Sequence, residues 1–442
     1  MLRIIFLIFA YFTKIALAAN ILVVGMPNGK SHISSMLPLL RELAQIFRDA
    51  SKSCDYVIRE HADEYQRIAS YPWDLILTDS LFAVCGYGLA SLSKAHHVIM
   101  HTSSMEGFYA LAKALGRQHA AAPPFFMDSW HSEFHVDHFF DRLNAIKEII
   151  TSWLMWNTFI NYYTKRSLAS IAPNFDFSVY SRTNSMSFTD MPLKFYVSEP
   201  ISNELFSYGC YCNSFNELQG ELVDFVNDPK SKGTILMAFG TILRLGNAPV
   251  NKLEAYVKAL NNLTNYNIIW GCTDCPPMKL EKHVRVMPWV PQIDILHHPK
   301  TKLFITHGGL KSVKEAICAA MPTLFMPVFA EQVRNAWLAK QHGFGQIINR
   351  FNLTDNYLLE LITEMLNNSP SYVKQARELS FTDMPISPLK EASFRISHLI
   401  KYGGRFPEYF YIRAANFGYI KYLNLDFILI IPAVILFVLT CK

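Results

Sequence analysis

The chain has 442 residues, of which 51% are hydrophobic and 14% aromatic. This composition excludes a disordered protein, and the length is enough for two domains that each have a core. The formal net charge is only +5 and the Lys and Arg residues are dispersed, which argues against nucleic-acid binding.

Both ends of the chain are apolar. Residues 1–19 are typical of a secretory signal peptide, with Arg3 ahead of an apolar run and a small-residue cleavage site at Ala16-Leu17-Ala18. Residues 425–441 are predicted to form a transmembrane helix, after an aromatic and basic juxtamembrane segment at 401–424. We expect a single-pass type I protein whose main part lies in the lumen of the endoplasmic reticulum. An uncleaved anchor and a buried core helix are the respective alternatives.

Residues 20–215 are predicted to form the first of two Rossmann-like domains. Buried parallel strands are predicted at Asn20–Met26, Trp73–Asp79 and Ala95–Thr102, and helices at Ser31–Arg48 and Ser80–Ser91. His32 lies in the first turn of the first helix, and Asp79 ends the second strand. Ligands bind at the carboxyl ends of strands in such sheets, so His32 is a candidate base with Asp79 behind it. A surface or capping histidine and a helix N-cap are the plainer interpretations of the two residues.

Residues 216–400 alternate strand and helix patterns with short Gly and Pro turns, which predicts a parallel, doubly wound sheet. The predicted strands are Thr234–Phe239, Tyr266–Trp270, Val284–Met287, Thr301–Thr306, Thr323–Val328 and Gln346–Asn349. The predicted helices are Pro249–Leu263, Lys311–Ala320, Gln332–His342, Asp355–Leu366, Tyr372–Leu379 and Lys390–Ile400. The turn His307-Gly308-Gly309 joins a strand to a helix whose free N–H groups and positive dipole end suit a diphosphate.

This turn belongs to a long pattern from Trp289 to Gln332, W-V-P-Q followed by T-H-G-G-L-K-S-V-K-E-A and A-E-Q. In this pattern the chain resembles the UDP-glycosyltransferases of the glucuronosyltransferase type, most closely the nematode-like members. The resemblance covers most of the chain. It implies two Rossmann-like domains facing each other across a cleft, the glycosyltransferase B fold, with the last helix crossing back to the first domain.

The resemblance also implies the reaction. A hexosyl group would move from a UDP-sugar, UDP-glucuronate or UDP-glucose, to a hydroxyl of a small lipophilic acceptor, with inversion, as in detoxification. The UDP-sugar is a co-substrate, and neither a further cofactor nor a metal is expected. His32 and Asp79 match the family's base and its supporting carboxylate. The oligomeric state stays open, a homo-oligomer included.

The donor-binding roles carry over residue by residue. Trp289 would stack on uracil, Gln292 would lie near uracil and ribose, and Glu315 would bind the ribose hydroxyls. The diphosphate would lie on His307, Gly308 and Gly309, and the donor sugar on Glu331 and Gln332. The other predicted donor-binding residues are Gly240, Thr241, Val290, Leu310, Lys311 and Ser312. The family often has Asn in place of Lys311 and Asp in place of Glu331.

A departure concerns the N-terminal domain. His32 and Asp79 lie much closer in sequence than in the family, so the domain is predicted to be shortened near residues 48–54. The alternative function is therefore an inactive member that binds UDP-sugar without transfer. A UDP-sugar epimerase would need no signal peptide, and a structural membrane protein would not need the spacing of the donor pattern.

Eight cysteines are scattered along the chain. Cys272-x-x-Cys275 has the spacing of a redox or zinc motif but has no second pair. Cys318 is expected to be a small core residue. An oxidising lumen permits disulfides, whose pairing the sequence does not give. Asn262, Asn352 and Asn367 begin glycosylation sequons.

Overall fold

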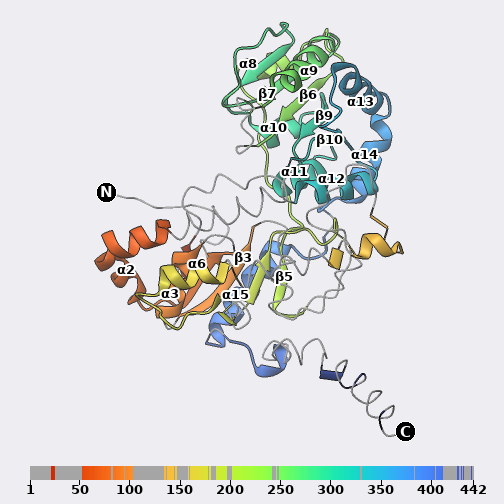
Figure 1. The fold of residues 1–442 in the computed structure, drawn as a ribbon. Coiled ribbons are helices and arrows are strands. Elements are labelled where there is room, and N and C mark those ends of the chain that lie inside the picture. Colours follow the sequence, from red (N-terminus) through yellow and green to blue (C-terminus); the bar gives the residue numbers. More distant parts are fainter. Residues whose placement is uncertain are drawn as a thin grey trace.

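The fold of the chain is a computed structural model with two parallel sheets, each covered by helices (Figure 1). It describes residues 21–24, 52–80, 83–93, 95–102, 134–135, 137–143, 145–146, 158, 160–177, 179–180, 186–196, 202–240, 245, 248–328, 331–382, 384–403, 405–411, 426–427, 430, 432 and 440.

The first sheet has five strands in the order β1-β2-β3-β4-β5, all parallel. Its strands are β1 (Ile21–Val24), β2 (Leu75–Asp79), β3 (His96–His101), β4 (Met186–Thr189) and β5 (Leu205–Ser207). Its helices include α2 (Ala62–Ala69), α3 (Val84–Leu92) and α6 (Asn161–Leu168). The spatial order follows the chain order, so within the described residues β1 is an edge strand.

The core of the first sheet is completed by a helix from the far end of the chain. Helix α15 (Pro388–Lys401) begins after Ser387, whose hydroxyl accepts from the backbone N–H of Lys390. Its buried residues Ala392, Ile396 and Leu399 pack in one cluster with Leu75 and Leu77 of β2 and with other residues of the first sheet. In Figure 1 the blue α15 lies beside this sheet, which confirms the predicted crossing back to the N-terminal part.

The second sheet has six parallel strands in the order β11-β10-β9-β6-β7-β8. The strands are β6 (Thr234–Ala238), β7 (Asn267–Gly271), β8 (Val284–Met287), β9 (Thr301–Thr306), β10 (Thr323–Phe325) and β11 (Gly345–Ile347). The helices are α8 (Glu221–Val226), α9 (Val250–Asn261), α10 (Gln292–His297), α11 (Leu310–Cys318), α12 (Gln332–Gln341), α13 (Asp355–Asn367) and α14 (Ser369–Glu378), and a 3₁₀ turn, η5 (Glu408–Phe410), follows α15. The chain builds β6, β7 and β8 to one side and β9, β10 and β11 to the other, so the order reverses between β6 and β9, where such sheets bind their ligands.

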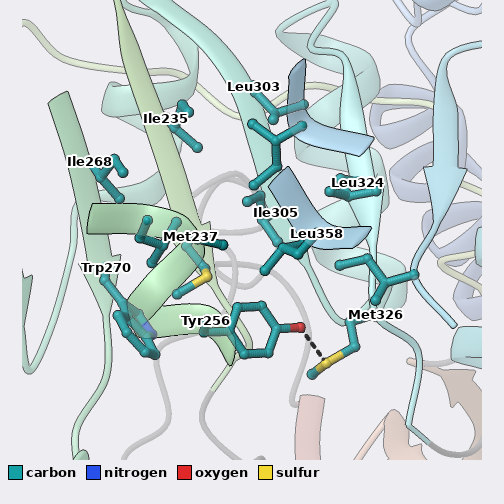
Figure 2. Close-up of a cluster of buried hydrophobic side chains, with 14 of the residues drawn as sticks. Ile235, Met237, Tyr256, Ile268, Trp270, Leu303, Ile305, Leu324, Met326 and Leu358 are labelled. Atoms are coloured by element: carbon teal, nitrogen blue, oxygen red, sulfur yellow. Dashed lines mark hydrogen bonds between the residues drawn. The ribbon is translucent and has the colours of Figure 1, made fainter. Parts of the chain in front are cut away.

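One face of the second sheet packs on α9 and α13 around a large apolar cluster (Figure 2). Trp270, Met237 and Ile305 are fully buried there, and each such side chain contributes about 1.5–3 kcal/mol. The hydroxyl of the fully buried Tyr256 donates to the sulfur of Met326 at 2.6 Å. The sulfur of Met326, a weak acceptor, therefore satisfies the Tyr256 hydroxyl, the polar side-chain group of α9 within the cluster.

Most predicted elements are confirmed within a few residues, and Thr301–Thr306 and Val284–Met287 have the predicted bounds. Strands β4 and β5 and helix α10 were not predicted. The signal peptide and the helix at Ser31–Arg48 lie outside the described residues, as do most residues of 425–441. In the part of the chain that the structure describes, no helix is both long enough and apolar enough to cross a membrane.

Three disulfides join Cys54 to Cys85, Cys212 to Cys318 and Cys272 to Cys275, and Cys210 is a buried free thiol. The expectation that Cys318 is a simple core residue is wrong. Its side chain is half-buried and bonded to the connection after β5, because α11 turns that face toward the first half of the chain.

Candidate donor nucleotide site

The turn between β9 and α11 is built around the ring of His307. A Cβ added at Gly240 would lie 2.9 Å from His307 Cε1, and one at Gly309 would lie 2.8 Å from His307 Nε2. Both positions therefore need glycine, because their backbones approach the ring too closely for a side chain. Gly240 follows β6 and Gly309 caps α11, so the predicted glycines of two neighbouring strands meet at one histidine.

His307 is buried, and burial lowers its pKa to about 4. The ring is therefore neutral at pH 7 and carries one N–H donor. The hydroxyl of Thr306 lies 3.3 Å from Nδ1. His307 can contribute a hydrogen bond to a phosphate oxygen, but in the unliganded protein it contributes no charge.

The backbone of the turn is held from behind by Asn335 of α12. This fully buried side chain donates from Nδ2 to the carbonyl oxygen of Gly308 at 2.9 Å, and its Oδ1 accepts from the hydroxyl of Tyr196. Sequence reasoning missed Asn335. An amide inside an otherwise good helix is a weak local signal for such a role.

Lys311 supplies the charge at this end of α11. It is exposed in the first turn, where the helix dipole disfavours a cation. Among the described residues no carboxylate lies within ion-pair distance of its ammonium group, although burial raises the pKa of the nearby Glu315 carboxyl and the charge of Lys311 opposes that rise. An exposed lysine beside free helix N–H groups makes this turn suited to an anion.

One turn further along α11, Glu315 accepts a hydrogen bond from Gln292 Nε2 at 2.6 Å. The same nitrogen lies 3.4 Å from the Ser312 hydroxyl. Burial raises the pKa of Glu315, and the bond from Gln292 opposes that shift. The structure thus brings together Gln292 and Glu315, the two residues predicted for the ribose of the donor, and places Ser312, another predicted donor-binding residue, beside them.

Trp289 extends from the carboxyl end of β8 with 74% of its surface exposed. A tryptophan this exposed offers a free ring face for a planar base. The next residue, Val290, is buried, and its side chain leaves no room for a Cβ on Gly271. Val290 and the equally buried Leu310 therefore offer a ligand only their backbone groups.

Glu331 and Gln332 lie at the start of α12 and are both buried. The Oε1 of Gln332 accepts from the backbone N–H of Val328 at 2.9 Å, which ties the helix start to the loop after β10. Thr241 lies outside the described residues, so its place beside the turn stays a prediction.

On the first sheet, Asp79 ends β2 and accepts a hydrogen bond from the Thr102 hydroxyl at 2.6 Å. Thr102 follows β3, so the carboxylate is held along the carboxyl edge of the sheet. His32 lies outside the described residues. The pairing of His32 with Asp79 stays a prediction.

Two parallel α/β sheets, each covered by helices, have the arrangement of the glycosyltransferase B class of folds. The solved structure of the glycosyltransferase of kitacinnamycin has this arrangement. The alignment covers 87% of this chain and 98% of the solved chain, with a TM-score of 0.58 and 15% sequence identity.

The chain belongs to the family described as UDP-glucoronosyl and UDP-glucosyl transferase, whose pattern matches residues 17–442. A UDP-glucuronosyltransferase of Pleuronectes platessa is 34% identical over 226 residues, 50% of this chain and 47% of the relative. The human 2-hydroxyacylsphingosine 1-beta-galactosyltransferase is 26% identical over 416 residues, 90% of this chain and 72% of that protein. The match thus spans about half the length of the plaice relative.

Proposed function

We propose that this chain moves a hexosyl group from a UDP-sugar to a hydroxyl of a small lipophilic acceptor, with inversion at the anomeric carbon. The observation that carries the proposal is the first turn of α11. Free N–H groups, the exposed Lys311 and the neutral donor His307 converge there, one helical turn from the bonded pair Glu315 and Gln292. An anion site thus lies next to a site for hydroxyl groups, as the diphosphate lies next to the ribose in a nucleoside diphosphate.

The donor would lie along the carboxyl ends of β8, β6 and β9. Trp289 would stack on uracil, and Gln292 and Glu315 would bind the ribose. The Gly308 and Gly309 amides, with Lys311, would bind the diphosphate, and Glu331 with Gln332 would hold the sugar hydroxyls. The charge on the departing UDP would be balanced by the helix dipole and Lys311.

The chemical step is a direct displacement. His32 would accept the proton of the acceptor hydroxyl while that oxygen forms a bond to C1 of the sugar. The bond between C1 and the phosphate oxygen breaks, and UDP leaves with the electron pair. Asp79, held by Thr102, would orient the imidazole and balance its developing charge.

A second function is binding of a UDP-sugar without transfer. The observation that favours it is the edge position of β1 in the described part of the first sheet. Doubly wound sheets usually place strands on both sides of their first strand, and the predicted shortening near residues 48–54 falls directly between β1 and β2. The acceptor side would then lack part of its lining.

We also propose a single-pass type I protein with its main part in the lumen of the endoplasmic reticulum. Three disulfides suit an oxidising compartment. The three sequon residues Asn262, Asn352 and Asn367 are all exposed on the second half, where glycosylation could reach them. Glycosidase digestion of the expressed chain should raise its mobility on a gel, and an unchanged mobility would contradict the proposal.

The activity is tested with membranes that express the chain and its His32→Ala and Trp289→Ala variants. Labelled UDP-glucuronate, UDP-glucose and UDP-galactose are offered with a panel of simple phenols, and UDP affinity is measured separately. We expect one donor to give product with wild type, about 100-fold less with His32→Ala at unchanged UDP affinity, and weak UDP binding with Trp289→Ala. His61→Ala, at an exposed histidine between two N-terminal helices, is the matched control.

The outcomes separate the two functions. Product that depends on His32 supports transfer and identifies the sugar. Saturable UDP binding that depends on Trp289, without product from any donor, supports the binding function. Equal product from wild type and His32→Ala would contradict the proposed base.

A further inference from the structure

Helix α11 carries two neighbouring rows of side chains with different contacts. Lys311 and Glu315 lie one turn apart on the row that faces the proposed donor. Leu310, Lys314 and Cys318 form the next row, and each contacts the first half of the chain. Leu310 joins an apolar cluster with residues that follow β4, Lys314 pairs with a carboxylate, and Cys318 is disulfide-bonded.

The carboxylate is Asp190, the residue directly after β4. Lys314 Nζ donates to its Oδ1, and both side chains are at least nine-tenths buried. The backbone N–H of Asp190 donates to the carbonyl oxygen of His101 at 2.9 Å, which holds the residue at the sheet edge. The ring of Tyr211 lies 3.8 Å from Lys314 Nζ and covers the pair. The ion pair thus joins two halves of the molecule through a buried contact.

Burial raises the pKa of the Asp190 carboxyl and lowers that of the Lys314 ammonium, and each partner opposes the shift of the other. Removing two charges from water costs several kcal/mol, so well-packed apolar residues would stabilise this contact about as well. What a hydrogen-bonded ion pair adds is a fixed relative position, because it is favourable in only one geometry.

The pair lies close to the predicted catalytic edge. Asp79 pairs in register with Met100, and His101 pairs with Thr189, so Asp79 and Asp190 end strands that lie about 10 Å apart on one edge. Tyr208 lies within electrostatic range of both carboxylates. Burial raises its pKa, and the charges of Asp190 and Asp79 raise it further. The start of α11 is therefore anchored to the same edge that carries Asp79.

We propose that Lys314 and Asp190 are a positioning pair, which holds the donor turn of α11 at a fixed place against the catalytic edge of the first sheet. Neither residue touches the proposed donor. The pair acts by setting where C1 of the sugar lies relative to the acceptor and its base, so its effect on turnover rests on the proposed function. A misplacement of about 1 Å can cost about 100-fold in rate.

The test compares Lys314→Met, Lys314→Arg and the double variant Lys314→Met/Asp190→Leu with wild type. The single Met variant leaves a buried lone carboxylate and is expected to lose stability, whereas the double variant removes both charges and keeps the fold. For the double variant we expect kcat to fall about 100-fold while UDP affinity stays within about threefold of wild type. Lys314→Arg, which keeps the positive charge, should have a kcat between those of the double variant and wild type.

The matched control is Lys194→Met. Lys194 also reaches from the segment after β4 to the second half, donating to the Ser380 carbonyl at 2.7 Å, but this contact is exposed. Wild-type kcat is expected for this variant. A double variant that turns over at the wild-type rate would overturn the positioning role.

Hydrogen exchange gives a readout that does not need turnover. UDP binding at α11 should slow exchange of amides in 186–211 of wild type, and this protection should be absent in the double variant. If wild type shows no product but this protection is present and depends on the pair, the proposed transfer fails and the pair stands. If UDP binds to wild type without protecting 186–211, the pair does not couple the halves and the inference fails.

Discussion

The two sheets of this molecule differ in how they are completed. The second sheet runs β8-β7-β6-β9-β10-β11, with three strands on each side of its switch point. The first sheet, in its described part, runs from β1 to β5 in chain order and has strands on one side of β1 only. The second sheet therefore has strands on both sides of its switch point, whereas the described part of the first sheet continues on one side of β1. On the proposed function, donor binding would depend on the second sheet and not on the first.

The largest effect is expected from a test of whether the halves fold separately. Phe304→Ala in β9 and Phe188→Ala in β4 each remove a fully buried ring and should cost about 3–5 kcal/mol. We expect Phe304→Ala to abolish UDP binding and Phe188→Ala to preserve it, as measured by calorimetry beside denaturant unfolding. The milder changes Phe304→Leu and Phe188→Leu are the controls. Loss of UDP binding in Phe188→Ala would show that the proposed donor site depends on the first sheet.

The pH dependence of stability should have a large contribution from His307 of the second half. The unfolded chain takes up a proton at His307 below about pH 6.5, whereas the folded protein does so only near pH 4. Burial of the neutral ring therefore leaves the free energy of unfolding unchanged above pH 6.5. As the pH falls from 6.5 to 4, the free energy of unfolding decreases by about 3 kcal/mol. Denaturant unfolding of wild type and His307→Gln between pH 7 and 4 measures it.

The His307→Gln variant should show a smaller slope of stability against pH than wild type. His61→Gln, at an exposed position, should keep the wild-type slope. Equal slopes for wild type and His307→Gln would mean that His307 is not held neutral by burial.

The nucleoside end of the site gives a smaller and more specific effect. If Glu315 binds ribose hydroxyls, wild type should prefer UDP over 2′-deoxy-UDP by about tenfold, and Glu315→Gln should lose most of this preference. Calorimetry with the two nucleotides measures it. A preference that survives the substitution would assign the ribose to another residue.

The smallest effect concerns the family departure at Lys311. Lys311→Asn should weaken UDP binding about threefold to tenfold, because one exposed charge near the diphosphate is lost. The salt dependence of binding should become flatter in the same variant. Lys374→Asn, at an exposed lysine on α14, is the control. An unchanged salt dependence would place the diphosphate away from Lys311.

The sequence predicted the second half best, for a physical reason. β9 is buried along almost its whole length and reads as a largely apolar run, and β8 is a short run that ends before Pro288, so both were predicted with their observed bounds. Strand β4 was missed because it is short and contains the buried polar residues Ser187 and Thr189, and β5 was missed because it has only three residues. Their place in the sheet comes from long-range pairing rather than from local pattern.

The candidate site divides in the same way. The glycines of the turn were predicted from the local strand–turn–helix pattern, and Lys311 and Glu315 from the family resemblance, because both signals lie in one short stretch of sequence. Asn335 was missed because its partners Gly308 and Tyr196 are remote in sequence. The pairing of Cys212 with Cys318 could not be predicted for the same reason, because 106 positions separate the two residues.

The packing of α15 on the first sheet has a consequence for folding during synthesis. Leu75 and Leu77 leave synthesis more than three hundred residues before their partner Leu399, and at about 5–20 residues per second the delay is on the order of tens of seconds. During that time the sheet that is made first has an open apolar face, while β6 to β11 emerge and can fold behind it. The N-terminal half of this chain is therefore begun first and finished last.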